Sequence, residues 1–471
     1  MKSQTKRTFK FVFVTLFVDL LAFTLILPLL PKILDYYAIN DKSNAYKLFD
    51  ENVKIIQKIL AVPESHNQVL LAGVLGSWFS FLQFISSPFL GALSDRFGRK
   101  SVLLMAMSGS VVSYAIWFTA SSNFALFVLS RTIGGLSKAN VGLSLAIVSD
   151  VSDESTRGKG MAIVGSSFSL AFIFGPLLGA YLSTLAKGTD IQAVQHQLIT
   201  NPSLIALFLS VINLALVFAF LEETYSSKQT NNKTSRTGTS AQNESVFVKA
   251  FHFVNPRSLF SFDLVDKISQ EEAKVLKTTG CIYFYYLLFY SGLEFTLSFL
   301  THLRFGFSSM DQGKLYLFSG LLMALIQGGY IRRIKGGREP FLALVGLAII
   351  VPSFILMGLS INVAQIYCSL SMYATSSAIV VPCLTTIISS HSPVESRGVV
   401  MGTFRSLGSL ARAIGPCMAS LLFWTFGPTI CYISGALALL IPYFQMKKLY
   451  SSTYRDRKSI KSPDFHLAKA S

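Results

Sequence analysis

The chain has 471 residues, of which 51% are hydrophobic and only 14% charged, and its mean hydropathy is +0.52. A soluble domain carries roughly 25% charged residues, so this composition excludes an ordinary water-soluble globule. The net charge of +17 is explained by the positive-inside rule if both termini are cytoplasmic, because most of the lysines and arginines then fall in cytoplasmic segments. This distribution argues against a nucleic-acid partner.

Twelve apolar stretches are long enough, at about 20 residues each, to cross a hydrocarbon core of ~30 Å. We expect each to be a helix, because lipid offers the backbone no hydrogen-bonding partner, and the fold class is therefore an all-α membrane protein. The predicted spans cover residues 11–34, 69–91, 101–120, 124–149, 158–184, 203–221, 278–301, 312–331, 341–359, 364–390, 398–424 and 428–446.

These spans divide the chain into two bundles of six helices, at 1–221 and 278–446. A cytoplasmic linker (222–277) joins them, and a basic cytoplasmic tail (447–471) follows the second bundle. The long outer loop 35–67 contains YKLFDENVKIIQKIL, whose apolar spacing predicts a short surface helix.

The first span contains Asp19, and a charged group inside a membrane costs a few kcal/mol and usually faces a cavity or a partner. Asp19 is therefore expected either to carry a proton or to form an ion pair. The second span adds Gln83, an uncharged polar group that could contact a substrate.

The decapeptide GALSDRFGRK, from Gly91 to Lys100, lies between the second and third spans. It combines turn-forming glycines with Asp95 among several cations, which indicates an ion-paired latch as well as a positive anchor. The peptide resembles the signature G-x-L-x-D-R-x-G-R-[KR] of the major facilitator superfamily. That resemblance implies a conformational latch made by the motif residues, with Asp150 at the end of the fourth span as the acidic partner. The predicted latch residues are Gly91, Asp95, Arg96, Gly98, Arg99 and Asp150.

The fourth span carries Arg131 and Lys138. The segment SRTIGG around Arg131 resembles the R-x-x-x-G element of proton-linked carriers in this superfamily, which implies a proton-coupling or ion-pair role. Lys138 stands where that element usually has small residues. It is expected either to attract an anion or to close an ion pair with Asp19.

The chain repeats itself at an offset of 240 residues, where nine of 24 positions from Arg157 to Ala180 match those from Arg397 to Ser420. Two homologous halves with a substrate site between them near mid-membrane are the expected result. The repeat aligns Gly175-Pro176 with Gly415-Pro416, and such pairs bend helices and allow close packing. The segment AFIFGPLLGA also resembles the Gly-Pro motif of antiporters, except that alanine replaces glycine at 171 and 180.

Arg405 and Arg412 lie seven residues apart in the eleventh span and so project from one helix face. Their repeat counterparts are Gly165 and Phe172, so these charges belong to one half only. Guanidinium groups match oxyanions bidentately, which makes this face a candidate anion site. The alternative is that each arginine neutralises Glu294 or Asp19. Gln327 in the eighth span is a further candidate for substrate contact.

Glu294 in the seventh span also has two possible roles. In a low-dielectric cavity an unpaired carboxyl group binds a proton more readily and could carry it across the membrane. Otherwise Glu294 is a standing ion-pair partner.

The sequence contains no signal for a disulfide framework, a metal site or an ATP-binding site. All five cysteines fall inside predicted spans, so neither a disulfide framework nor a metal site is expected. The sequence contains no Walker A motif, which argues against an ATP-driven pump, and we expect neither a cofactor nor an enzyme activity.

The runs SGLEFTLSFLTHLRFGFSS and GTFRSLGSLARAIGP resemble an animal branch of the superfamily close to bacterial tetracycline exporters. That resemblance implies transport of organic anions, including anionic drugs, in the plasma membrane or inner nuclear membrane. We expect a monomer that moves its substrate by alternating access. Two alternatives remain: a proton-coupled antiporter that exports amphipathic drugs, and a membrane scaffold or sensor that transports nothing.

Overall fold

The computed structural model describes residues 3–60, 67–152, 154–185, 191–224, 259–260, 270–331, 337–392 and 397–452. Across these ranges the chain is helical, without strands. The helices of the N-terminal half are α1 (Ser3–Thr24), α2 (Leu30–Asn40), α3 (Ala45–Leu60), α4 (Asn67–Phe97), α5 (Arg99–Thr119), α6 (Phe124–Ser137), α7 (Asn140–Asp150), α8 (Glu154–Thr184) and α9 (Ile191–Phe220). Those of the C-terminal half are α13 (Gln270–Phe305), α14 (Ser309–Gly329), α15 (Glu339–Leu359), α16 (Val363–Ser390), α17 (Arg397–Ala438) and α18 (Leu440–Tyr450).

All twelve predicted spans lie on these helices, but the first, the fourth and the twelfth spans are each divided between two helices. The first span is interrupted by turns at 25–29, between α1 and α2, and the fourth is interrupted between α6 and α7. The twelfth span is interrupted at Leu439, between α17 and α18. Within α17, the non-helical residue Gly427, whose positive φ of 78° suits glycine, separates the eleventh span from the twelfth as predicted. Within the described ranges, seven helices are long and apolar enough to cross a membrane.

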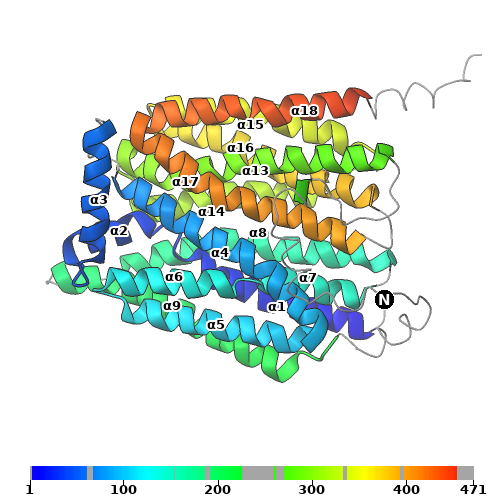
Figure 1. The fold of residues 1–471 in the computed structure, drawn as a ribbon, viewed down its shortest axis with the longest axis horizontal. Helices are drawn as coiled ribbons and strands as arrows, with labels where there is room; N and C mark the ends of the chain where they lie inside the picture. The colour runs from blue at the N-terminus through cyan, green and yellow to red at the C-terminus, as the bar shows by residue number, and fades with distance from the viewer. Residues whose placement is uncertain are drawn as a thin grey trace, which may run out of the picture.

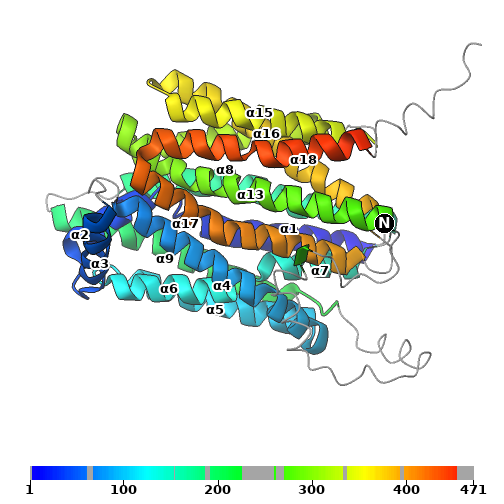
Figure 2. The same cartoon turned by 45° about the horizontal axis from the view of Figure 1, so that its top comes forward.

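The long helices run side by side, so that the start of α1 and the end of α18 lie at the same end of the bundle (Figure 1). This terminal end is opposite the end capped by α2 and α3, which we call the α3 end (Figures 1 and 2). The N-terminal and C-terminal halves form the two sides of the molecule, as the turned view in Figure 2 also shows. Of the linker and the tail, residues 225–258, 261–269 and 453–471 lie outside the described ranges.

The two halves meet along two seams, α4 against α17 and α8 against α14. Small residues allow the first seam to close: Gly73 faces Ser420, and Ser77 accepts a hydrogen bond of 2.8 Å from the N–H of Cys417. On the second seam, a Cβ added to Gly320 would clash with Ile173. Closer to the terminal end, a Cβ at Gly165 would meet nothing within 4 Å. The halves are therefore tightly joined toward the α3 end, while α8 borders open space nearer the termini.

The Gly-Pro pairs are packing sites inside each half. A Cβ on Gly175 of α8 would clash with Thr24 of α1, and a Cβ on Gly415 of α17 would clash with the carbonyl oxygen of Leu288 in α13. Pro176 and Pro416 lie inside these same helices. The repeat seen in the sequence thus places equivalent close helix contacts in both halves.

The long loop at the α3 end is organised around Asp41, and the helix predicted within it is present as α3. The Asp41 carboxylate accepts hydrogen bonds from the backbone N–H groups of Tyr46 (2.9 Å) and Phe124 (2.9 Å), and from the hydroxyl of Ser43 (2.6 Å). Partial burial raises the pKa of Asp41, but these hydrogen bonds outweigh it, so the pKa lies below its usual value. One carboxylate therefore fastens the start of α3 to the first turn of α6.

Candidate functional site

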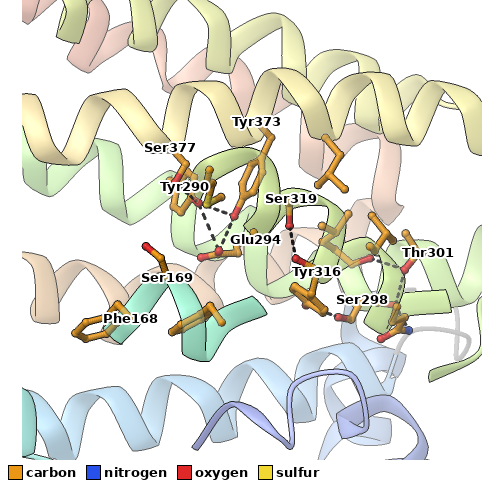
Figure 3. Close-up of a pocket in the computed structure, with 17 residues that line it drawn as sticks. Phe168, Ser169, Tyr290, Glu294, Ser298, Thr301, Tyr316, Ser319, Tyr373 and Ser377 are labelled. Carbon is orange, nitrogen blue, oxygen red and sulfur yellow. Dashed lines mark hydrogen bonds between the residues drawn. The ribbon is translucent and has the colours of Figure 1, made fainter. Parts of the chain in front are cut away.

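A cavity of about 180 Å³ lies between the two halves. Helices α13, α14 and α16 supply most of its wall, and α8 of the N-terminal half supplies Phe168, Ser169 and Phe172. Figure 3 shows Phe168 and Ser169 on one side of the cavity and Tyr373 of α16 on the other. The cavity thus occupies the position expected for a substrate site, with residues from both homologous halves in its wall.

Glu294 is the acidic group of this cavity, and tyrosine hydroxyls hold one of its oxygens (Figure 3). Tyr373 donates a hydrogen bond of 2.5 Å to Oε1, and the hydroxyl of Tyr290 lies 3.4 Å from the same atom. The two tyrosine hydroxyls are 2.5 Å apart, and their rings stack at 5.2 Å with an interplanar angle of 6°. Among the described residues, no cation lies within ion-pair distance of Glu294.

Arg405 and Arg412 project from α17 and are both exposed to solvent. The charge of Arg412 acts on Glu294, and Arg405 and Arg412 act on each other, although neither arginine is among the residues that line the cavity. In the described part of the chain, neither guanidinium lies within ion-pair distance of Glu294 or Asp19, and Asp19 pairs with Lys138 instead. Two adjacent exposed cations without a carboxylate partner remain available to an anion.

Lys138 has a different environment from these arginines. Its Nζ lies 2.7 Å from Asp19 Oδ2, and both side chains are only 5% exposed. Asn140 donates a second hydrogen bond of 2.8 Å to Asp19, and Lys138 also lies 4.9 Å from the ring centroid of Phe23. Of the two alternatives for Lys138, the structure therefore shows the ion pair with Asp19.

This ion pair lies at the interruption between α6 and α7. The carbonyl group of Lys138 accepts a hydrogen bond of 3.2 Å from Gln83 Nε2, and the carbonyl of Gly135 accepts one of 3.3 Å from Ser86. Gln83 thus contacts the broken helix backbone, whereas Gln327 accepts a hydrogen bond of 3.2 Å from Ser169 beside the cavity. The five predicted substrate-binding residues therefore fall into separate groups.

Arg131 is buried among aromatic rings without a carboxylate partner in the described ranges. Its guanidinium carbon lies 4.9 Å from the ring centroid of Trp117 and 5.5 Å from that of Phe127. Attraction between the guanidinium group and the faces of these rings partly offsets the free-energy cost of burying a cation. Its Nη2 has no hydrogen-bond partner among the described residues.

The predicted latch motif connects the ends of three helices. Arg99 Nε lies 3.0 Å from Asp150 Oδ2, which joins α5 to α7, and Arg99 Nη1 donates a hydrogen bond of 2.6 Å to Ser94. Gly98 has a φ of 94°, a conformation that glycine adopts without strain. The carbonyl of Gly91 accepts a hydrogen bond of 2.6 Å from Ser94. The side chains of Asp95 and Arg96 lie outside the description.

Glu223 is a member of this cluster that the sequence reading missed. Its two oxygens accept hydrogen bonds from the N–H groups of Arg99 (2.8 Å) and Lys100 (3.0 Å) at the start of α5. A carboxylate at a helix N-terminus stabilises it by satisfying free N–H groups. An acid directly after the sixth span, opposite a basic turn, is the sequence signal that points to this contact.

We expect the Asp150→Asn variant to transport more slowly with little change in KM, because it weakens a contact between helix ends distant from the cavity. An ion pair of this partial exposure contributes about 1 kcal/mol, which changes the balance of two conformations roughly fivefold. Initial uptake rates at several substrate concentrations would measure the effect. Asp50→Asn, which removes an ion pair from α3, is the matched control. A changed KM at unchanged maximal rate would contradict the latch role.

The tyrosines near Glu294 were also missed. Tyr286, Tyr290 and Glu294 recur every four residues and so share one face of α13, and the rings of Tyr286 and Tyr290 stack at 5.1 Å. This spacing was readable from the sequence. The contribution of Tyr373 was not, because it depends on how α16 packs against α13.

Comparison with known proteins agrees with this architecture. The family model described as Major Facilitator Superfamily matches residues 12–416. Major facilitator superfamily domain-containing protein 10 from Mus musculus is 38% identical over 450 residues, covering 94% of this chain and 93% of that protein. Tetracycline resistance protein, class B, from Escherichia coli is 26% identical over 353 residues, covering 74% of this chain and 78% of that protein.

Among solved structures, the crystal structure of the human organic anion transporter MFSD10 (TETRAN) superposes with a TM-score of 0.77 at 38% identity. The match covers 94% of this chain and 100% of that one. The fold of two helical halves with a cavity between them and these matches in sequence and structure point to the same family. The chain belongs to the major facilitator superfamily and is an integral membrane transporter with the fold of that family.

Proposed function

We propose that this protein transports small organic anions across a membrane by alternating access. The observation that carries the proposal is the pair Arg405 and Arg412 on α17, two exposed guanidinium groups that form no ion pair with the described residues. The charge of Arg412 also acts on Glu294 in the wall of the cavity. Guanidinium groups bind carboxylates and other oxyanions through parallel hydrogen bonds. The likeness to a human organic anion transporter supports the same substrate class.

The arrangement of the halves supports the mechanism. Tight seams toward the α3 end and open space beside Gly165 nearer the termini suit a carrier whose cavity communicates with the terminal side. Rocking of one half against the other would then expose Arg412 to the opposite side.

We further propose that the terminal end faces the cytoplasm, because the positive-inside rule favours that orientation. The protein acts as a monomer in the plasma membrane or inner nuclear membrane, has no nucleic-acid partner and is not an enzyme. The linker and the basic tail belong to the cytoplasmic side.

Proton coupling is a second candidate feature, favoured by one observation. Glu294 lines the cavity with tyrosine hydroxyls, not a cation, around its Oε1 atom, so it could exchange a proton with the cavity. An antiporter of amphipathic drugs would use Glu294 in this way. A scaffold without transport has no need of exposed arginines beside a cavity.

The test is uptake of a labelled aromatic carboxylate into proteoliposomes that contain the purified protein, at equal and at unequal pH across the membrane. Saturable uptake that excess unlabelled anion suppresses is the expected result. Liposomes without protein are the control. Uptake no faster than this control, by protein that binds the anion, would favour the scaffold instead. A rate that follows the pH gradient would identify proton coupling.

A further inference from the structure

We infer that the cavity around Glu294 is a subsite for a protonated amine, so that the preferred substrates are small zwitterions whose anionic group binds Arg412. This inference rests on the proposed function, because it takes Arg412 as the anion site. It adds to the anion site a second binding site, for a positively charged group, which an organic anion without an amine would not occupy.

The carboxylate of Glu294 can accept further hydrogen bonds from a ligand. Its Oε1 accepts the hydrogen bond from Tyr373, whereas Oε2 accepts none from the described residues. Glu294 lines the cavity, so Oε2 is the carboxylate oxygen left for a ligand there. A carboxylate accepts up to about four hydrogen bonds, and an ammonium group has three protons to donate.

The wall of the cavity favours a cation over an anion. The residues that line it include Glu294 but no lysine or arginine. Aromatic rings from both halves surround the space, and the faces of such rings attract ammonium groups. The rings belong to Phe168, Phe172, Tyr290, Tyr316 and Tyr373. A carboxylate enclosed by aromatic rings recognises an amine by charge and by cation–π attraction together.

The position of Arg412 fixes the orientation of such a ligand. An anionic group is repelled by Glu294 and attracted by Arg412, which is exposed on α17 and lies outside the residues that line the cavity. With about 180 Å³ available, the cavity holds an ammonium group on a short stem or a single ring. The matched substrate therefore carries its two opposite charges at the two ends of a compact body.

The experiment compares two ligands that differ only in the amine: para-(aminomethyl)benzoate, a zwitterion, and para-ethylbenzoate, an anion of the same shape. Both are titrated onto purified full-length protein in detergent. We expect the zwitterion to bind roughly tenfold to a hundredfold more tightly, because it adds a charge-assisted hydrogen bond. Glu294→Gln should reduce this ratio to about one, and Phe172→Leu should reduce it severalfold.

Asp311→Asn is the control, because it removes a carboxylate at the exposed start of α14 and should leave the ratio unchanged. Equal binding of both ligands to the unmodified protein would overturn the inference without any variant. A ratio that survives in Glu294→Gln would also overturn it. Uptake of para-ethylbenzoate into proteoliposomes is measured separately. If uptake occurs while the two ligands bind equally, only the amine subsite is ruled out. If uptake is absent, the proposed transport of organic anions is ruled out.

Discussion

Replacing Arg412 by alanine is expected to reduce uptake of an organic anion roughly tenfold to a hundredfold, since a charge-assisted contact to a guanidinium contributes about 1.5–3 kcal/mol. Arg412 is exposed on α17 and forms no ion pair among the described residues, so its removal leaves no buried carboxylate without an ion-pair partner. The loss should therefore affect substrate binding and not folding. Initial uptake rates and thermal unfolding of the same preparation separate these two effects.

Three further variants sharpen this test. Arg412→Lys keeps the charge but not the planar fork, and should retain part of the activity. Arg405→Ala should have a smaller effect, because Arg405 lies two helical turns closer to the terminal end of α17. Lys314→Ala removes an exposed cation outside the cavity and should change uptake less than twofold. Full activity of Arg412→Ala would show that the anion binds elsewhere.

Replacing Asp19 by asparagine is expected to lower the free energy of unfolding by about 3–5 kcal/mol, because the variant leaves the buried ammonium of Lys138 without its carboxylate. Both partners are 5% exposed and only 2.7 Å apart, so water cannot replace the lost charge. Unfolding of the purified protein in detergent, followed by heat or by denaturant, measures the change.

The double variant Asp19→Asn with Lys138→Met is the matched control for this prediction. Removing both charges should restore most of the stability, since neither partner is then left buried and unpaired. The difference between the double variant and the sum of the single variants gives the coupling energy of the pair. Independent, additive effects of the two single variants would mean that the ion pair does not stabilise this interruption of the fourth span.

Much of the fold was predictable because membrane insertion leaves few choices. Apolar runs of sufficient length located the spans, and the repeat from Arg157 to Ala180 indicated two related halves. Interruptions inside a span were harder to predict. At the break after Ser137, Gln83 and Ser86 of α4 donate hydrogen bonds to the carbonyl groups of Lys138 and Gly135, and the sequence of the fourth span does not indicate these contacts.

The candidate site was predictable by residue type but not by pairing. Intramembrane charges were identified because each is costly, yet the sequence could not choose between Arg412 and Lys138 as the partner of Asp19. That choice depends on which side chains the packed helices bring within 3 Å. The tyrosines around Glu294 were missed because Tyr is common near membrane surfaces, so its presence in a span indicates little by itself.

The hydrogen bonds of Asp41 indicate where a probe of the transport motion can be attached. Because it ties the start of α3 to the first turn of α6, we expect α3 to move with the N-terminal half. Its contact with the C-terminal half includes Phe49, which packs against Leu70 and Trp424. Leu48 on the same helix is 63% exposed. A fluorescent dye attached there, paired with an acceptor on the C-terminal half, would report the motion of one half past the other in real time without altering the cavity.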